Sequence, residues 1–122
     1  MLTIGSVVLG VDDVRRAVAF WTAALGYVPR DAVDDDWVVL VPANGPGVQV
    51  ALGRSTSPVQ DHPRVHLDLY ARDAADQAAE VERLVALGAR HVDWDSYPED
   101  PDFVVLADPS GNRFCVIDAG RT

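Results

Sequence analysis

The same order of segments occurs twice along this chain, and that repeat is the strongest constraint on its fold. In the first half the apolar run "LTIGSVVLGV" is followed by the helical pattern "VRRAVAFWTAALG", and in the second half "RVHLDLYA" is followed by "AADQAAEVERLVALG". Each half closes with a predicted hairpin, "WVVLVPANGPGVQVAL" and then "FVVLADPSGNRFCVID". A recurring order of elements indicates a repeated supersecondary unit.

The two helical patterns start and stop at equivalent residues. Asp13 and Asp73 each precede a helical pattern and suit the N-cap position, and a glycine follows each pattern where a helix commonly ends. Aligning these two aspartates also aligns Ser6 with His66, and aligning the hairpins brings Gln49 onto Cys115.

This repeat predicts an α+β fold made of two tandem βαβββ modules within a single domain of residues 1–122. The first module covers residues 1–53, a polar, proline-containing linker covers 54–63, and the second module covers 64–118. A chain of 122 residues is long enough for one buried core but short for two domains.

Composition excludes several classes of partner. The net charge of −9 leaves no basic excess to neutralise phosphates, so we expect no binding to nucleic acid. No apolar run approaches the roughly 18 residues of a membrane helix, and the first residues lack a basic leader segment. A single cysteine fits a reducing compartment, and we therefore expect a cytoplasmic protein.

The segment "DPSGN" before the last predicted strand raises the question of a phosphate-binding loop. Such a loop has to open a helix, whereas this one opens an apolar strand. Asp, Pro, Gly and Asn also set the dihedral angles of tight turns. We therefore interpret it as the turn of a hairpin.

Alternation in "VHLDLYA" places three polar side chains on one face of the predicted strand. His66, Asp68 and Tyr70 share that face, while Leu67 and Leu69 point the other way. The polar face is either the wall of a solvated pocket or, in the alternative, a satisfied network or an exposed face. In the pocket interpretation, Asp68 would orient His66 as a general base, which makes these two the candidate catalytic residues.

The last predicted strand carries the only cysteine, Cys115, on the same face as Arg113 and Ile117. A lone cysteine on a strand is commonly a small buried hydrophobe. The alternative is a nucleophile, for which His66 is the conceivable activating partner. Cys115 and Arg113 are therefore candidate ligand-binding residues.

Aromatic residues and carboxylates precede both hairpins, in "DDDW" and in "DWDSYPEDPDF". Such a combination suits a flat, cationic molecule through cation–π contacts and charge attraction. In the alternative interpretation the aromatic rings start core strands and the carboxylates are solvated. The candidate ligand-binding aromatic residues are Trp37, Trp94, Tyr97 and Phe103, together with Tyr70.

The pattern "HLDLYARD…LGAR…DPSGNRFCV", with "FW…ALG" in the first half, resembles the glyoxalase, bleomycin-resistance and dioxygenase family, also called the vicinal oxygen chelate superfamily. The resemblance covers essentially the whole chain and is greatest to the small glyoxalase-like branch. It implies paired βαβββ modules that each curl a mixed sheet into a cup, and a homodimer.

The resemblance also implies where a metal would bind in metal-dependent relatives, namely at Ser6, Gln49, His66 and Cys115. Of these only His66 is a strong ligand for the hard ions of that chemistry, and a site generally needs about three good ligands. We therefore expect no metal cofactor, or, if one binds, His66 with Gln49 as its ligands.

A second arrangement starts from His66 and Asp68, because His-x-Asp forms part of some iron sites. It lacks a third ligand unless His62 or His91 supplies one.

Together these features predict a metal-independent binding protein for a small cationic or aromatic compound such as an antibiotic. Ser6, Gln49 and the residues named above would line its site. The alternative is an enzyme of the lyase, isomerase, cyclase or dioxygenase type that uses His66 and Asp68, with or without a divalent metal.

Overall fold

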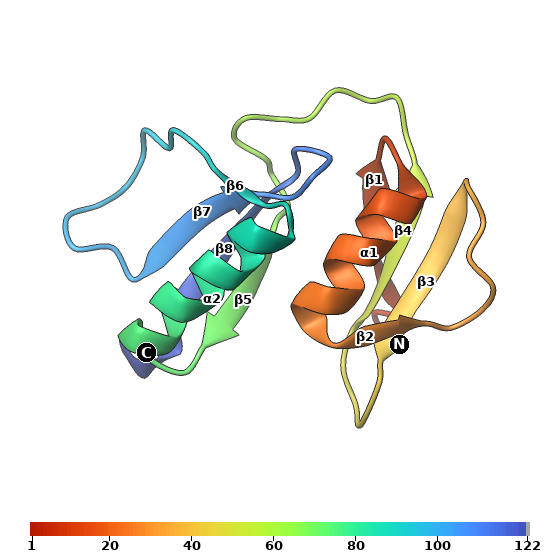
Figure 1. Cartoon of the computed structure of the whole chain (residues 1–122), viewed down its shortest axis with the longest axis horizontal. Coiled ribbons are helices and arrows are strands. Elements are labelled where there is room, and N and C mark those ends of the chain that lie inside the picture. The colour runs from red at the N-terminus through yellow and green to blue at the C-terminus, as the bar shows by residue number, and fades with distance from the viewer. Residues whose placement is uncertain (122) are drawn as a thin grey trace. The chain divides into compact units, whose positions relative to one another are not determined.

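The computed structural model describes residues 1–121, and their contacts divide the chain into two units. The first unit is Met1–Pro58 and the second begins at Val59. The boundary falls inside the predicted linker. Each unit consists of a four-stranded mixed sheet with one α-helix packed on it (Figure 1).

The first unit has the strand order β1-β4-β3-β2, in which β1 and β4 are parallel and the other pairs are antiparallel. Its elements in chain order are β1 (Ser6–Val11), α1 (Val14–Leu25), β2 (Tyr27–Pro29), β3 (Trp37–Pro42) and β4 (Gln49–Arg54).

The second unit repeats this topology with the order β5-β8-β7-β6, and again only its first pair is parallel. Its elements are β5 (Leu67–Ala71), α2 (Ala74–Leu87), β6 (Arg90–His91), β7 (Phe103–Ala107), β8 (Arg113–Asp118) and a short 3₁₀ helix (Ala119–Arg121). The predicted pair of βαβββ modules is therefore confirmed. Among the described residues, neither α-helix is long and apolar enough to cross a bilayer.

Both helices begin at the predicted aspartates. The Asp13 carboxylate accepts a hydrogen bond of 3.0 Å from the Arg16 N–H, and Asp73 accepts one of 2.8 Å from the Asp76 N–H. These contacts satisfy amide groups that lack a partner in the first turn of a helix. Gly26 ends α1 with a φ of 68°, a left-handed conformation that favours glycine.

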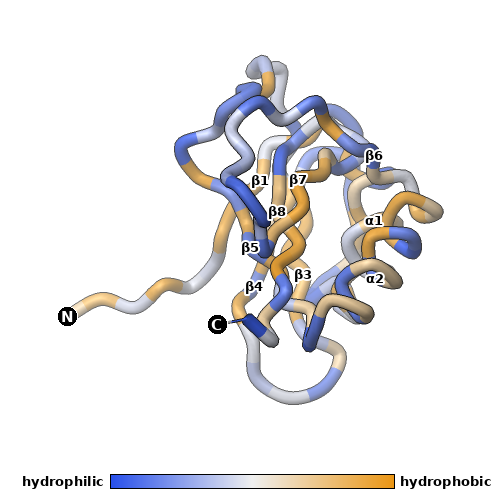
Figure 2. Tube along the Cα trace, turned by 90° about the vertical axis from the view of Figure 1, so that its left-hand side faces the viewer, coloured by the Kyte–Doolittle hydropathy of each residue, from blue (hydrophilic) through white to orange (hydrophobic). Residues whose placement is uncertain are grey.

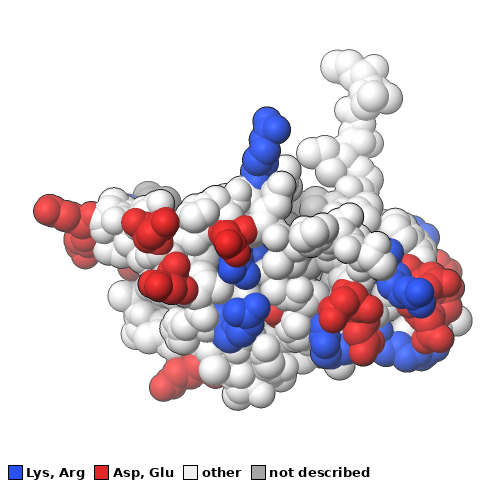
Figure 3. Space-filling view, turned by 90° about the horizontal axis from the view of Figure 1, so that it is seen from above, with Lys and Arg blue, Asp and Glu red and all other residues white. Residues whose placement is uncertain are grey.

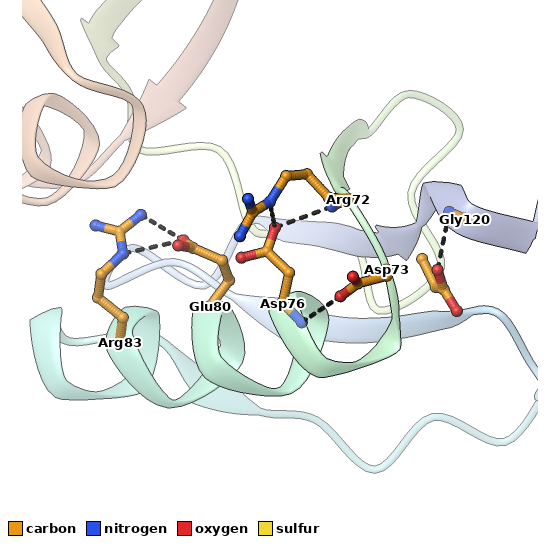
Figure 4. A network of polar contacts seen from close by, with 7 residues as sticks. Arg72, Asp73, Asp76, Glu80, Arg83 and Gly120 are labelled. Carbon is orange, nitrogen blue, oxygen red and sulfur yellow. Dashed lines mark hydrogen bonds and ion pairs between the residues drawn. The ribbon is translucent and has the colours of Figure 1, made fainter.

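A chain of charged contacts follows the first turns of α2 (Figure 4). Asp76 accepts hydrogen bonds from the Arg72 backbone N–H at 2.9 Å and from its guanidinium at 3.4 Å. The backbone contact is the main reason that the pKa of Asp76 lies below its usual value. Glu80 pairs with Arg83 one turn later, at 2.6 Å. An ionised Asp76 at this end of α2 also suits the helix dipole.

The core of each unit lies between its helix and its sheet. In the first unit, Phe20 and Trp21 on α1 are buried and meet edge to face with ring centroids 5.0 Å apart. In the second, Phe114 and Val116 of β8 are buried beneath α2. Figure 2 shows the apolar course of β7 and the hydrophilic segments in the connecting loops.

The segment "DPSGN" is the turn between β7 and β8, as predicted. Asp108 is fully buried, and its Oδ1 accepts hydrogen bonds from the backbone N–H groups of Ser110 and Asn112 at 3.0 and 2.8 Å. Gly111 has a φ of 96°, which a side chain would strain. The backbone N–H groups of Ser110, Gly111 and Asn112 all donate to Asp108 and close the turn, so this loop does not resemble a phosphate cradle.

Two predicted strands are shorter than their apolar patterns. β1 begins at Ser6, and the preceding Leu2 and Ile4 are exposed. β5 begins at Leu67, so His66 lies directly before the strand. Apolar character alone predicted the longer limits, but a strand extends only as far as a neighbouring strand pairs with it.

Candidate functional site

The polar side chains predicted on one face of the second unit do share that face. Asp68 is the register partner of Cys115 in the parallel β5–β8 pair, and Tyr70 is the partner of Ile117. The Tyr70 side chain is 75% exposed. The alternate residues of β5 are partly buried on the side that carries α2, as the alternation of a strand requires.

His66 and Asp68 lie within hydrogen-bond distance of each other on this face. His66 Nε2 lies 3.0 Å from Asp68 Oδ1, and the two side chains are 42% and 50% exposed. Because both side chains are this exposed, water solvates each of them without help from their mutual contact. The pair is therefore accessible to a molecule from solvent, as both interpretations of this polar face allow.

Cys115 lies beside this pair and is only 8% exposed. Burial raises the pKa of its thiol to about 11, and the negative charge of Asp68 and a hydrogen bond to it act in the same direction. An activated nucleophile requires the opposite shift of the pKa. The structure therefore favours a protonated thiol at neutral pH, and the interpretation of Cys115 as a nucleophile receives no support.

The predicted equivalence of Gln49 and Cys115 is wrong. Val39 of β3 and Val105 of β7 are equivalent residues of the repeat. Val105 lies opposite Cys115, whereas Val39 lies opposite Ala51. Because the two hairpins differ in loop length, Cys115 corresponds to Ala51.

In the first unit, Ser6 is the register partner of Gln49, and the Ser6 hydroxyl donates to the Gln49 carbonyl at 3.5 Å. The Gln49 side-chain oxygen lies 3.5 Å from the Arg30 guanidinium. The structure brings these two predicted residues together, and their contacts are within the first unit.

Trp37 starts β3 on the same face of the first unit as Gln49. It is 46% exposed and lies against Gly53, its register partner, where an added Cβ would be 3.2 Å from the indole ring. The absence of a side chain at Gly53 lets the ring lie against the strand. Trp37 therefore presents an exposed aromatic surface, as the ligand-binding interpretation requires.

Arg113 is largely committed to contacts that hold its own unit together. Its side chain is 13% exposed, and it donates to the Gly111 carbonyl at 2.8 Å and to Asp61 at 3.1 Å. The contact with Asp61 ties the segment before β5 to β8. Sequence reasoning missed Asp61, because nothing in the pattern indicates a partner so far along the chain.

Trp94 stacks on His62, with ring centroids 4.7 Å apart. His62 Nε2 also lies 2.8 Å from Asp95 Oδ1, and that contact is the main reason that the pKa of Asp95 lies below its usual value. His62 is therefore engaged with Asp95, and its contacts do not support the alternative in which His62 supplies a third ligand to His66 and Asp68.

Tyr97 and Phe103 anchor the long loop of the second unit. The Tyr97 hydroxyl accepts a 2.8 Å hydrogen bond from the Val105 N–H, and the two aromatic rings lie 5.2 Å apart. Both residues thus have a role in the fold, as the alternative interpretation of the aromatic loops proposes.

Metal-ligand atoms meet at one point of this unit. An imidazole nitrogen of His66, a carboxylate oxygen of Asp68 and the Cys115 sulfur all lie within 4.8 Å of one another. This set does not fit the hard ions expected from the resemblance, because a thiolate is a soft ligand. Nitrogen, oxygen and sulfur together do fit zinc.

Comparison with solved structures identifies the same fold. A glyoxalase-related enzyme from Fulvimarina pelagi matches with a TM-score of 0.72 and 19% identity over 96% of this chain and 88% of that one. A glyoxalase/bleomycin resistance protein/dioxygenase family enzyme from Burkholderia phytofirmans PsJN matches with 0.72 and 15% identity, covering 94% and 97%. A lactoylglutathione lyase from Agrobacterium tumefaciens matches with 0.65 and 21% identity, covering 99% and 96%.

At these identities the structural matches establish the fold alone. No curated protein gives a significant match. The family model of the glyoxalase-like domain matches residues 6–117, which is nearly the whole chain. The match includes both modules and the group of His66, Asp68 and Cys115. The chain therefore belongs to the glyoxalase-like domain family.

Proposed function

We propose that this protein binds a small organic molecule on the exposed face of β5 and β8. The observation that carries the proposal is the solvent-accessible pair of His66 and Asp68, 3.0 Å apart, beside an exposed Tyr70. A tyrosine ring offers a flat apolar surface, and the pair offers hydrogen bonds that fix the orientation of a ligand.

Charge supports a preference for cations. The chain carries a net charge of −9, and Asp68 places a carboxylate on this face next to the Tyr70 strand position. A ligand cation would gain from both a carboxylate and an aromatic ring. Figure 3 shows acidic side chains in small groups on one face of the molecule, some of them beside arginines. The preference proposed here depends on Asp68. This binding requires no metal ion.

A thermal-shift screen tests the proposal, because a ligand of the folded state raises Tm. The panel contains aromatic cations, their neutral analogues and anions of similar size, all in the presence of EDTA. We expect the cations to raise Tm, and His66→Ala and Asp68→Asn to abolish the shift.

A matched control for those variants is the second His–Asp pair of the same unit. His62→Ala and Asp95→Asn remove a pair of the same chemistry, 2.8 Å apart, and should leave the shift unchanged. The proposal fails if anions stabilise the protein more than cations, or if the control variants lose the shift while His66→Ala keeps it.

A second function, general-base catalysis, is favoured by the geometry of the same pair. When His66 donates from Nε2 to Asp68, its Nδ1 is left as a proton acceptor. Such a base removes a proton from an acidic C–H bond of a bound carbonyl compound. Compounds from the screen, incubated with protein in D₂O, should then exchange that proton at a rate that His66→Ala abolishes.

Two further predictions concern the whole protein. A homodimer is checked by light scattering, and a cytoplasmic location by cell fractionation.

A further inference from the structure

Arg113 carries a buried donor that the contacts of its own unit leave unused. Its Nη1 donates to the Gly111 carbonyl at 2.8 Å, and its Nη2 lies 3.1 Å from Asp61 Oδ1. Among the described residues, its Nε is the one buried side-chain nitrogen or oxygen without a hydrogen-bond partner. Buried polar groups nearly always have such a partner, so the Nε–H of Arg113 requires an explanation beyond the fold.

Arg113 lies on the face of β5 and β8 to which the proposed function assigns the ligand. It is two residues before Cys115 on β8, and Cys115 is the register partner of Asp68. Side chains two residues apart on a strand share a face and lie roughly 6.5–7 Å apart along it. Extending the parallel register by one residue sets His66 opposite Arg113. A guanidinium therefore follows the Asp68 carboxylate along this face.

We propose that Arg113 binds a carboxylate of the ligand through Nε and Nη2, and that the site takes a small zwitterion rather than a simple cation. The inference rests on the proposed function, because Asp68 receives the cationic group of the same molecule. Nε and Nη2 donate along one edge of the planar guanidinium, and a carboxylate binds such an edge with both oxygens. Asp61 engages this edge through Nη2 alone.

Asp61 is the group that the ligand carboxylate replaces. Its side chain is 83% exposed, whereas that of Arg113 is 13% exposed. An ion pair with one partner this exposed contributes little to stability, so Asp61 turns into solvent at low cost. Arg113 keeps its position because Nη1 stays bound to the Gly111 carbonyl. A carboxylate that takes the place of Asp61 on Nη2 brings its second oxygen to Nε.

The spacing of the two charges fits a small zwitterion. Arg113 and Asp68 are separated along the strands by one step of two residues, and a hydrogen bond of about 2.8 Å at each end takes up most of that separation. A carboxylate and an ammonium on the same carbon or on neighbouring carbons fill the rest. An aromatic body then extends along the face toward the exposed Tyr70. Aromatic amino acids have this pattern of groups.

Three probes with one aromatic body test the role of the carboxylate: phenylalanine, phenethylamine, which lacks the carboxylate, and 3-phenylpropanoate, which lacks the ammonium. Isothermal titration calorimetry measures their affinities for the full chain. A charge-assisted contact with arginine is available only to a carboxylate, so phenylalanine should bind about 10-fold more tightly than phenethylamine. Arg113→Gln should remove that difference. Arg113→Lys keeps the charge without the two-donor edge and should retain only part of it.

Asp61→Asn separates ligand binding from a structural role of the same contact. Asp61→Asn and Arg113→Gln both break the ion pair of Asp61 with Arg113, so a purely structural pair predicts the same effect from both. The proposal predicts opposite effects. Asp61→Asn removes the competing carboxylate and should strengthen the binding of phenylalanine, whereas Arg113→Gln weakens it. Circular dichroism verifies that each variant folds.

The Nε–H resonance of Arg113 reports the contact directly in ¹⁵N-labelled protein, and its loss in Arg113→Lys assigns it. Phenylalanine should shift this resonance, and phenethylamine should not. The wild-type resonance decides even where Arg113→Gln fails to fold. The proposal is overturned if neither phenylalanine nor 3-phenylpropanoate moves the resonance, or if a folded Arg113→Gln binds phenylalanine as tightly as the wild type. Phenethylamine that binds on the β5–β8 face as tightly as phenylalanine overturns this inference and leaves the proposed function standing.

Discussion

Asp68 and Cys115 lie directly opposite each other in the parallel β5–β8 pair, where burial raises the pKa of the thiol and the carboxylate raises it further. Asp68 is exposed to solvent, whereas Cys115 is nearly buried.

The raised pKa predicts slow alkylation of Cys115. With a pKa of about 11 in the folded chain against 9.0 for an ordinary thiol, the thiolate at pH 8 is about 100-fold scarcer in the folded protein. The rate of reaction with iodoacetamide, followed by mass spectrometry, should inflect near pH 11 in the folded protein and near 9 in urea. An inflection near 9 in the folded protein contradicts the effect of burial.

The same shift predicts how stability depends on pH. Between pH 9 and 11 the folded chain keeps a proton that the unfolded chain has lost, so the contribution of Cys115 to stability is complete below pH 9 and falls as the pH rises to 11. Asp68→Asn removes the negative charge and should move the upper limit of this window downward. Urea unfolding at a series of pH values measures this loss of stability. Cys115→Ser lacks the thiol and should show no such loss between pH 9 and 11.

Asp108 should be essential for stability although it does not bind a ligand. Asp108→Ala removes both hydrogen bonds to the Ser110 and Asn112 amides from a buried turn, and we expect a loss of about 3 kcal/mol in the free energy of unfolding. Asp93→Ala, at an exposed position, should change it by less than about 0.5 kcal/mol. If Asp108→Ala lowered the free energy of unfolding no more than Asp93→Ala does, the hydrogen bonds of Asp108 would contribute nothing to stability.

The helix caps give a smaller and symmetrical prediction. Asp13→Ala and Asp73→Ala should each cost about 1 kcal/mol, because each leaves a first-turn N–H without its partner. Replacing either aspartate with asparagine should cost much less stability than replacing it with alanine, because asparagine also caps a helix. Thermal unfolding followed by circular dichroism compares the two series.

Local signals predicted most of the fold. Asp13 and Asp73 cap the helices, glycines end them, and the alternation in β5 places Asp68 and Tyr70 on one face. Each of these depends on residues near in sequence, where capping and side-chain alternation act directly.

The neighbour of each site residue could not be predicted in the same way. Alternation gives the face of a strand but not the register between β5 and β8, whose paired residues are far apart in the sequence. The repeat aligned Cys115 with Gln49, whereas the hairpin loops shift that register and place Cys115 opposite Asp68. The group of His66, Asp68 and Cys115 became visible only once the strands were paired.

NMR locates ligand binding on the protein residue by residue and so tests whether ligands bind on the β5–β8 face. Uniformly ¹⁵N-labelled protein is titrated with the aromatic cations that raise Tm, and amide shifts are followed residue by residue. We expect the largest changes at Asp68, Tyr70 and Cys115, with little change on α2. Changes concentrated on α2, with the β5 and β8 amides unmoved, would contradict it.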